Sequence, residues 1–184
     1  NNRGSLMKST KLSFDKKRWP QRFPYLLSQY RFVRYKRKCE IYRERKITLP
    51  LFILYRFIFQ CYKIRYLTDI PASTEIGGGF KIEHLGNIVI NPKTKIGENV
   101  TILNGVLIGQ QNRGRKQGCP TIGNKVWIGT NSIVVGAIHI GNNVLIAPGA
   151  YINFDVPDNS IVLGNPGTII SKQDATDSYI TTYE

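Results

Sequence analysis

Residues 122–152 read IGNKVWIGTNSIVVGAIHIGNNVLIAPGAYI, and an aliphatic residue returns at every sixth position. The same period runs earlier in the chain, from Ile70 to Ile82 and from Ile90 to Ile108. An amphipathic helix would place apolar residues three or four positions apart, and a half-buried strand would place them two apart. A period of six fits neither pattern. It predicts instead that each hexad forms one short strand and one turn.

Such hexads stack as a parallel β-helix, a triangular prism with three hexads in each coil. Thirteen hexads begin between residues 70 and 152, which predicts a little over four coils. Gly and Asn follow the aliphatic positions, as in IGENVT at 96–101 and IGNNVL at 140–145, where tight corners favour them. A β-sandwich with glycine-rich turns would show strand spacings that vary between about eight and twelve residues. The regular period therefore argues against a sandwich.

Two interruptions of the period are the places where we expect function. In the first, eight residues rather than six separate Ile82 from Ile90, and His84 lies between them. In the second, fourteen residues separate Ile108 from Ile122, which leaves QQNRGRKQGCP, residues 110–120, as an excursion that ends at Cys119 and Pro120. Insertions in a solenoid are pushed outward and gather at binding sites.

Charge divides the chain into a basic arm and a neutral repeat region. The net charge is +14, and residues 8–66 hold 17 Lys and Arg against three acidic residues. The remainder, residues 67–184, holds eight basic and nine acidic residues. We expect an expression remnant at 1–6, a basic helical arm at 7–66, the repeat domain at 67–172 and a C-terminal tail at 173–184.

The arm is expected to be helical in two segments, residues 24–48 and 50–67, because Tyr, Phe and Leu mix with Arg and Lys at helical spacing. Pro50 restarts the second segment, which is too short and too charged to cross a bilayer. Three interpretations stay open: a cap on the prism, a contact with an anionic membrane surface, and nucleic-acid binding. The charge exceeds what capping requires, so we favour a cap that also meets an anionic membrane. Nucleic acid ranks last because no base-reading motif accompanies the charge.

The cysteines indicate the compartment. There are three, Cys39, Cys61 and Cys119, an odd number without the spacing of a metal site, and no signal peptide is recognised. We therefore expect a reduced, cytoplasmic setting without a structural metal.

Three stretches carry a family resemblance: DIPASTEIGGGFKIEHLGNIVINPKTKIGENVTI (69–102), GVLIGQQNRGRKQGCPTIGNKVWIGTNSIVVG (105–136) and VPDNSIVLGNPGTIISK (156–172). Together they resemble the hexapeptide-repeat acyltransferases, which fold as a left-handed parallel β-helix. Within them the chain is most similar to the serine O-acetyltransferase branch and its relatives that acetylate cell-surface polysaccharides. The resemblance implies transfer of acetyl from acetyl-CoA to a hydroxyl, in a homotrimer with active sites between neighbouring prisms.

His84 falls where that branch keeps its general base. A hydroxyl must lose its proton as it attacks the thioester carbonyl, and a neutral imidazole is suited to take it at pH 7. The resemblance implies that Asp69, fifteen residues earlier and close to one coil upstream, holds the imidazole. Glu83 matches a family position that carries an acceptor-binding aspartate. Each assignment has an alternative. His84 could be a surface histidine without a catalytic task, Asp69 a cap or turn residue before Pro71, and Glu83 a solvated surface charge.

The chain departs from the serine acetyltransferases in two ways. They keep a second histidine in HPTIG, where this chain has Cys119 in CPTIG. A thiol cannot reproduce the hydrogen bonds of an imidazole, and we assign Cys119 as a small filler beside a wider acceptor pocket rather than as a covalent nucleophile. Their long helical N-terminal domain is replaced by the short basic arm. Both departures favour a sugar acceptor.

For CoA, the resemblance places the pantetheine arm in the groove between prisms, near small residues that let it approach the backbone. Cations could meet the nucleotide phosphates. The predicted CoA-binding residues are Gly109, Thr130 and Ala147 for the arm, and Lys172, Arg113 and Arg115 for the phosphates.

The sequence thus favours a cytoplasmic, acetyl-CoA-dependent O-acetyltransferase acting on a sugar hydroxyl of a cell-surface polysaccharide or its precursor. Serine O-acetyltransferase is the alternative within the same class. A zinc carbonic anhydrase on this fold needs three histidine ligands, whereas the chain has only His84 and His139, and His139 in a regular hexad is expected on the surface. A membrane-associated scaffold is the non-enzymatic alternative.

Overall fold

The structure is a computed structural model, which describes residues 10–43 and 48–181. The expression remnant expected at residues 1–6 lies outside the described residues. So do residues 44–47 of the first expected helical segment, and residues 182–184 of the tail.

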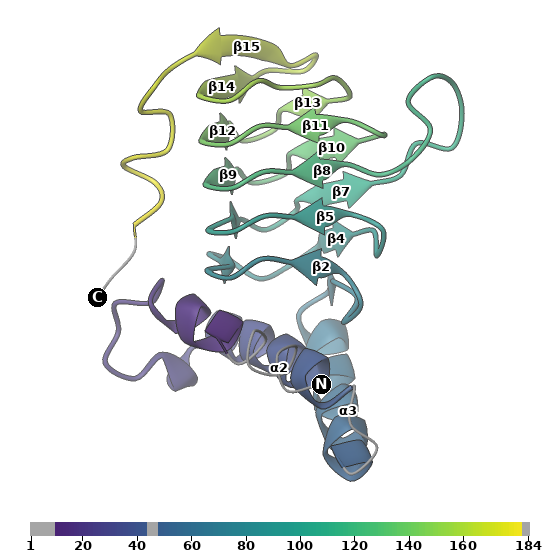
Figure 1. The fold of residues 1–184 in the computed structure, drawn as a ribbon, viewed down its shortest axis with the longest axis vertical. Helices are drawn as coiled ribbons and strands as arrows, with labels where there is room; N and C mark the ends of the chain where they lie inside the picture. Colours follow the sequence, from purple (N-terminus) through teal and green to yellow (C-terminus); the bar gives the residue numbers. More distant parts are fainter. Residues whose placement is uncertain (1–9, 44–47, 182–184) are drawn as a thin grey trace.

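Three parallel sheets close a triangular prism (Figure 1). The first sheet holds β1 (Thr68–Asp69), β4 (Ile88–Ile90), β7 (Leu107–Gly109), β10 (Ile133–Val135) and β13 (Tyr151–Ile152). The second sheet holds β2 (Glu75–Ile76), β5 (Lys95–Ile96), β8 (Thr121–Ile122) and β11 (His139–Ile140). The third sheet holds β3 (Lys81–Ile82), β6 (Thr101–Ile102), β9 (Val126–Ile128), β12 (Val144–Ile146), β14 (Ser160–Leu163) and the antiparallel β15 (Thr168–Ser171).

The hexad period builds the core of the prism. Strands pair in register between coils, so Ile76 stacks on Ile96 and Ile96 on Ile122. All thirteen periodic aliphatic residues are exposed by 5% or less. Burying such a side chain contributes about 1.5–3 kcal/mol. The predicted parallel β-helix is confirmed, with a continuous stack of buried aliphatic side chains along its axis.

The corners use Gly and Asn for two different purposes. Asn99 and Asn131 adopt left-handed backbone conformations, with φ of 56° and 59°. The Gly that directly follows the aliphatic residue does not. At Gly97 an added Cβ would lie 2.6 Å from the carbonyl oxygen of Gly123 in the next coil. The sequence predicted tight corners for both residue types, and at this glycine the cause is the close approach of successive coils.

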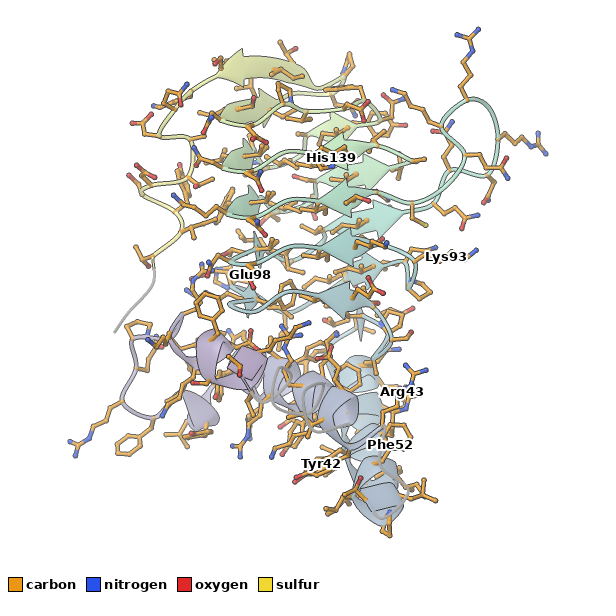
Figure 2. The ribbon with its side chains drawn as sticks, in the orientation of Figure 1. Tyr42, Arg43, Phe52, Lys93, Glu98 and His139 are labelled. Carbon is orange, nitrogen blue, oxygen red and sulfur yellow. The ribbon has the colours of Figure 1, made fainter. Side chains whose placement is uncertain are left out.

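The arm is helical, as expected. It contains η1 (Pro24–Leu26), α2 (Ser28–Tyr42) and α3 (Leu49–Arg65), and residues 10–16 are helical as well. The two long helices pack through aromatic pairs: the ring centroids of Phe32 and Phe59 are 5.0 Å apart. Figure 2 shows Tyr42 and Phe52 near the junction of α2 and α3. No helix among residues 10–43 and 48–181 is long and apolar enough to span a bilayer.

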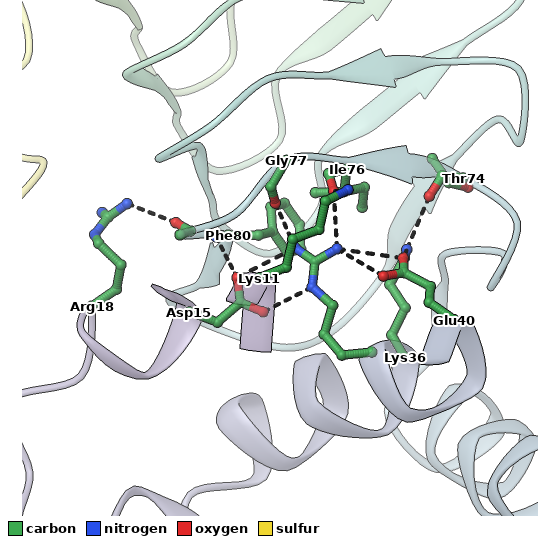
Figure 3. A network of polar contacts seen from close by, with 11 residues as sticks. Lys11, Asp15, Arg18, Lys36, Glu40, Thr74, Ile76, Gly77 and Phe80 are labelled. Atoms are coloured by element: carbon green, nitrogen blue, oxygen red, sulfur yellow. Dashed lines mark hydrogen bonds and ion pairs between the residues drawn. The ribbon is translucent and has the colours of Figure 1, made fainter. Parts of the chain in front are cut away.

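Basic side chains of the arm cap the first coil of the prism (Figure 3). Inner coils hydrogen-bond to a neighbour on each side, but the first coil has no coil before it, so its edge needs other partners. Arg37 donates to the carbonyl oxygens of Ile76, at 2.9 Å, and Gly77. Three more cations donate to carbonyl oxygens of this coil: Arg18 to Gly79, Lys36 to Thr74 and Lys11 to Ile76.

Two carboxylates complete this cap. Asp15 accepts the backbone N–H of Phe80 at 2.9 Å and pairs with Arg37 at 2.8 Å, both side chains being fully buried. Burial raises the pKa of Asp15, although Arg37 opposes the rise. Burial lowers the pKa of Lys36 to about 8 despite its ion pair with Glu40. The capping interpretation of the arm is therefore supported by specific contacts, which use part of its positive charge.

Candidate active site

His84 lies in the turn between β3 and β4, and its side chain is exposed. The turn is held at both ends: the N–H of Glu83 donates to Ile102 O at 3.0 Å, and the N–H of Gly105 to Gly86 O at 2.8 Å. Gly86 and Asn87 take positive φ values of 124° and 50°. The eight-residue step therefore forms an outward corner that presents the imidazole to solvent.

Asp69 ends β1, directly beside the strand that follows His84. β1 pairs with β4, and Thr68 Oγ1 accepts the N–H of Gly86 at 3.4 Å. The carboxylate is 65% exposed, and its Oδ1 lies 2.7 Å from Lys63 Nζ of α3. The structure thus brings the strand of Asp69 to the turn of His84, while the carboxylate pairs with a lysine. The imidazole–carboxylate contact stays a prediction.

The arm contributes residues that the sequence did not point to. Lys63 reaches Asp69 from α3, and Gln29 Nε2 of α2 donates to the carbonyl oxygen of Glu83 at 3.3 Å. The side chain of Glu83, the predicted acceptor contact, is paired with Lys81 at 2.8 Å. Lys63 belongs to no recognisable sequence motif. Its position beside Asp69 therefore follows from the fold alone.

Thr130 and Ala147 share a prism edge with His84, which we call the His84 edge. It comprises the turns from the third sheet to the first: residues 83–87, 103–106, 129–132 and 147–150. Thr130 Oγ1 donates to Asn104 Oδ1 at 3.2 Å, and Thr130 O accepts the N–H of Gly149 at 2.9 Å. Small and amide side chains therefore continue this edge away from His84.

The excursion occupies a second edge, between the first and second sheets, which we call the loop edge. Gly109 ends β7, and an antiparallel bridge between Gln111 and Gly118 closes the loop (Figure 1). Arg113 and Arg115 are exposed on it. Cys119 Sγ lies 3.8 Å from Gln110 Oε1, and burial raises the pKa of the thiol, with Lys93 opposing.

Lys172 lies at the third edge. Its N–H donates to Asn159 O at 2.7 Å, and its Nζ is 3.9 Å from Asp174 Oδ1. One chain therefore does not gather the predicted residues, because the strands of the first sheet lie between the His84 edge and the loop edge, and Lys172 lies at neither. His139 is exposed on β11, as expected (Figure 2).

Besides a cavity of about 270 Å³ lined by Cys39, Arg43, Phe52, Arg56, Ala72 and Ser73, two cavities flank the arm among the described residues. One of about 560 Å³ lies where the arm meets the second sheet, and it contains none of the predicted site residues; its lining includes Lys11, Glu40, Arg43, Thr74, Glu75 and Glu98. The other, of about 350 Å³, is lined by Gln60, Lys63, Ile64, Leu67, Thr68 and Asp69. Only the second reaches a predicted catalytic residue. Within the described parts of the chain, no group of three His, Cys, Asp or Glu side chains is arranged to hold a metal ion.

Comparisons with known proteins agree with this architecture. The family model "Bacterial transferase hexapeptide (six repeats)" matches residues 119–153. The putative colanic acid biosynthesis acetyltransferase WcaB of Escherichia coli K12 is 35% identical over 157 residues, covering 82% of this chain and 92% of that protein. A serine acetyltransferase of Helicobacter pylori is 36% identical over 110 residues, covering 59% of this chain and 64% of that protein.

A solved structure shares the fold. The serine acetyltransferase of Brucella abortus in complex with coenzyme A superposes with a TM-score of 0.72 at 21% identity, covering 94% of this chain and 69% of that chain. The chain therefore belongs to the hexapeptide-repeat transferase family. Within that family it is an acetyltransferase.

Proposed function

We propose that this protein transfers acetyl from acetyl-CoA to a sugar hydroxyl of a cell-surface polysaccharide or its precursor. The length of the match to WcaB, whose name refers to colanic acid biosynthesis, carries this proposal. That match covers 82% of the chain and is longer than residues 67–184, so it includes part of the arm. Serine acetyltransferases match over less of the chain, from 59% for that of Helicobacter pylori to 73% for that of Staphylococcus xylosus. Cys119 in place of a histidine supports the same choice.

His84 acts as general base in this proposal. Its neutral imidazole takes the proton of the acceptor hydroxyl as the oxygen attacks the thioester carbonyl carbon. The C–O bond forms, the C–S bond breaks, and the imidazolium returns the proton to the departing CoA sulfur. The exposed corner leaves room for both substrates, and Asp69 would stabilise the imidazolium once freed from Lys63.

A homotrimer would complete the site. The His84 edge of one prism and the loop edge of the next can face each other in a cyclic assembly, because a heterologous contact joins two different patches. Thr130 and Ala147 would then lie across a groove from Gly109, Arg113 and Arg115, and pantetheine and phosphates would bind between them. In this arrangement Lys172, at the third edge, stands apart from the groove.

Cys119 is proposed to fill space beside the acceptor. Its raised pKa keeps it a thiol at neutral pH, and a thiol is a weak nucleophile. We expect Cys119→Ser to retain transfer within about tenfold of the unaltered protein, measured as CoA release, with Cys61→Ser as the control at an exposed cysteine. A loss of about 10³-fold or more, with an acetyl group on Cys119 in the mass spectrum, would instead establish a covalent intermediate.

The acceptor class is tested by incubating the protein with acetyl-CoA and either L-serine or a panel of methyl glycosides and uronates. We expect a sugar to be acetylated and serine to be left unchanged, with the product read by mass spectrometry. Rapid turnover of serine alone would contradict the proposal and establish serine O-acetyltransferase.

The location we propose is cytoplasmic, in peripheral contact with the inner membrane face through the arm, residues 7–66.

A further inference from the structure

Helix α3 has an exposed apolar side. Residues spaced three or four apart lie on one side of a helix, and Ile53, Phe57 and Ile64 follow this spacing. Phe57 is 69% exposed and Ile64 is 67% exposed. Leu54 and Leu67 extend this surface, and Phe59 is the only buried residue of α3. We call Ile53, Leu54, Phe57, Ile64 and Leu67 the α3 stripe.

Cations border the α3 stripe on both sides. At 100° per residue, Arg65 lies on one side of Phe57, and Arg56 and Lys63 lie on the other. α3 contains no acidic residue. Lys63 is paired with Asp69, but two copies of the stripe in contact would set Arg56 and Arg65 against the same cations, with no acidic residue on α3 to neutralise them. A surface that offers both hydrocarbon and negative charge fits better, and an anionic lipid bilayer offers both.

The α3 stripe leads to the predicted catalytic carboxylate. Ile64 and Leu67 belong to the stripe and also line the 350 Å³ cavity that contains Asp69. Leu67 leaves α3 in a left-handed conformation, with φ of 47°, and β1 begins at the next residue. A molecule anchored in lipid against the stripe would thus find its polar head beside Asp69 and Lys63.

We propose that the α3 stripe docks on an anionic lipid surface and that the acceptor is a sugar held in that surface by a lipid anchor. This rests on the proposed sugar O-acetyltransferase activity and names the physical form of its substrate. The arm carries other exposed apolar side chains, Phe23 and Leu26, before α2.

Vesicle sedimentation tests the docking. The full chain is expected to sediment with vesicles of phosphatidylglycerol and phosphatidylcholine, less so as salt is raised, and not with phosphatidylcholine alone. The double variant Ile53→Glu/Phe57→Glu should bind about 100-fold more weakly, because two apolar anchors are lost and two negative charges added. Ile170→Glu, an exposed position on β15, is the matched control and should bind normally. Equal sedimentation of both variants would overturn the proposal.

A probe on Cys61 tests which surface is buried. Cys61 is exposed on α3, four residues after Phe57 and three before Ile64. An environment-sensitive fluorophore there, in a Cys119→Ser background, should shift to the blue with anionic vesicles. A shift without lipid that grows with protein concentration, together with a smaller particle mass for the double variant, would show that a second copy covers the stripe and overturn the proposal.

Acceptor presentation separates this inference from the proposed function. The sugar that is acetylated in the panel is offered as its methyl glycoside in solution and as a long-chain alkyl glycoside in anionic vesicles. We expect at least tenfold faster transfer to the vesicle-held sugar at equal concentration, lost in Ile53→Glu/Phe57→Glu, which should keep its rate on the soluble glycoside. Equal rates would overturn the lipid-held substrate and leave the proposed function intact. Failure on every sugar would contradict the proposed function, while vesicle binding would still decide the docking.

Discussion

Replacement of His84 by alanine is expected to lower acetyl transfer by about 10²- to 10⁴-fold, the contribution of a positioned general base. The acceptor hydroxyl has a high pKa, and without an imidazole nothing assigned to the site accepts its proton during attack. The side chain is exposed in an outward turn, and that turn is held by backbone contacts of Glu83, Gly86 and Gly105. The substitution should therefore leave the fold and the free energy of unfolding nearly unchanged.

The measurement is kcat/KM for acetyl transfer to the accepted sugar. His139→Ala is the matched control, because it removes an exposed histidine from a regular hexad and should keep full activity. Activity of the alanine variant near that of the unaltered protein would show that His84 is not the base.

The prism could be predicted from the sequence because one physical rule acts thirteen times. Each hexad places one aliphatic side chain inside, and register between coils turns the period into a continuous stack such as Ile76, Ile96 and Ile122. Local turn chemistry and global packing favour the same structure, so the repeat can be recognised in the sequence. The interruption at His84 can be recognised as a departure from the same period, and the structure places it in an outward turn between β3 and β4.

The environment of the site could not be predicted from the sequence. Lys63 meets Asp69 only because α3 returns to the first coil, and nothing in the residue pattern links them. Edge assignment is a second example: the sequence assigned Lys172, together with Arg113 and Arg115, to the CoA phosphates. The prism places Lys172 at a different edge, because the antiparallel β15 crosses back over the third sheet. Such relations come from tertiary packing rather than from period or composition.

The positive charge of the arm is partly structural, and Arg37 is its central example. The fully buried guanidinium pairs with Asp15 and Glu40 and donates to two carbonyl oxygens of the first coil. Burial alone would lower the pKa of Arg37, but the two carboxylates outweigh it and hold the pKa above its usual value. Removing the guanidinium would leave Asp15 as a buried, unpaired charge and take its donor from the carbonyl oxygen of Gly77, while Ile76 O would keep Lys11.

Arg37→Ala is therefore expected to lower the free energy of unfolding by about 3–5 kcal/mol, the typical effect of breaking a buried ion pair on one side. Chemical denaturation at one fixed protomer concentration measures it, because assembly would otherwise contribute. The stability of Arg37→Lys should lie between that of the unaltered protein and that of Arg37→Ala, because lysine keeps the charge but lacks the planar guanidinium that reaches several acceptors. Arg43→Ala, an exposed arginine just after α2, is the control and should change stability by about 0.5 kcal/mol or less. If Arg37→Ala and Arg43→Ala were equally mild, the arm would not be the cap of the prism, and its charge would serve surface contacts alone.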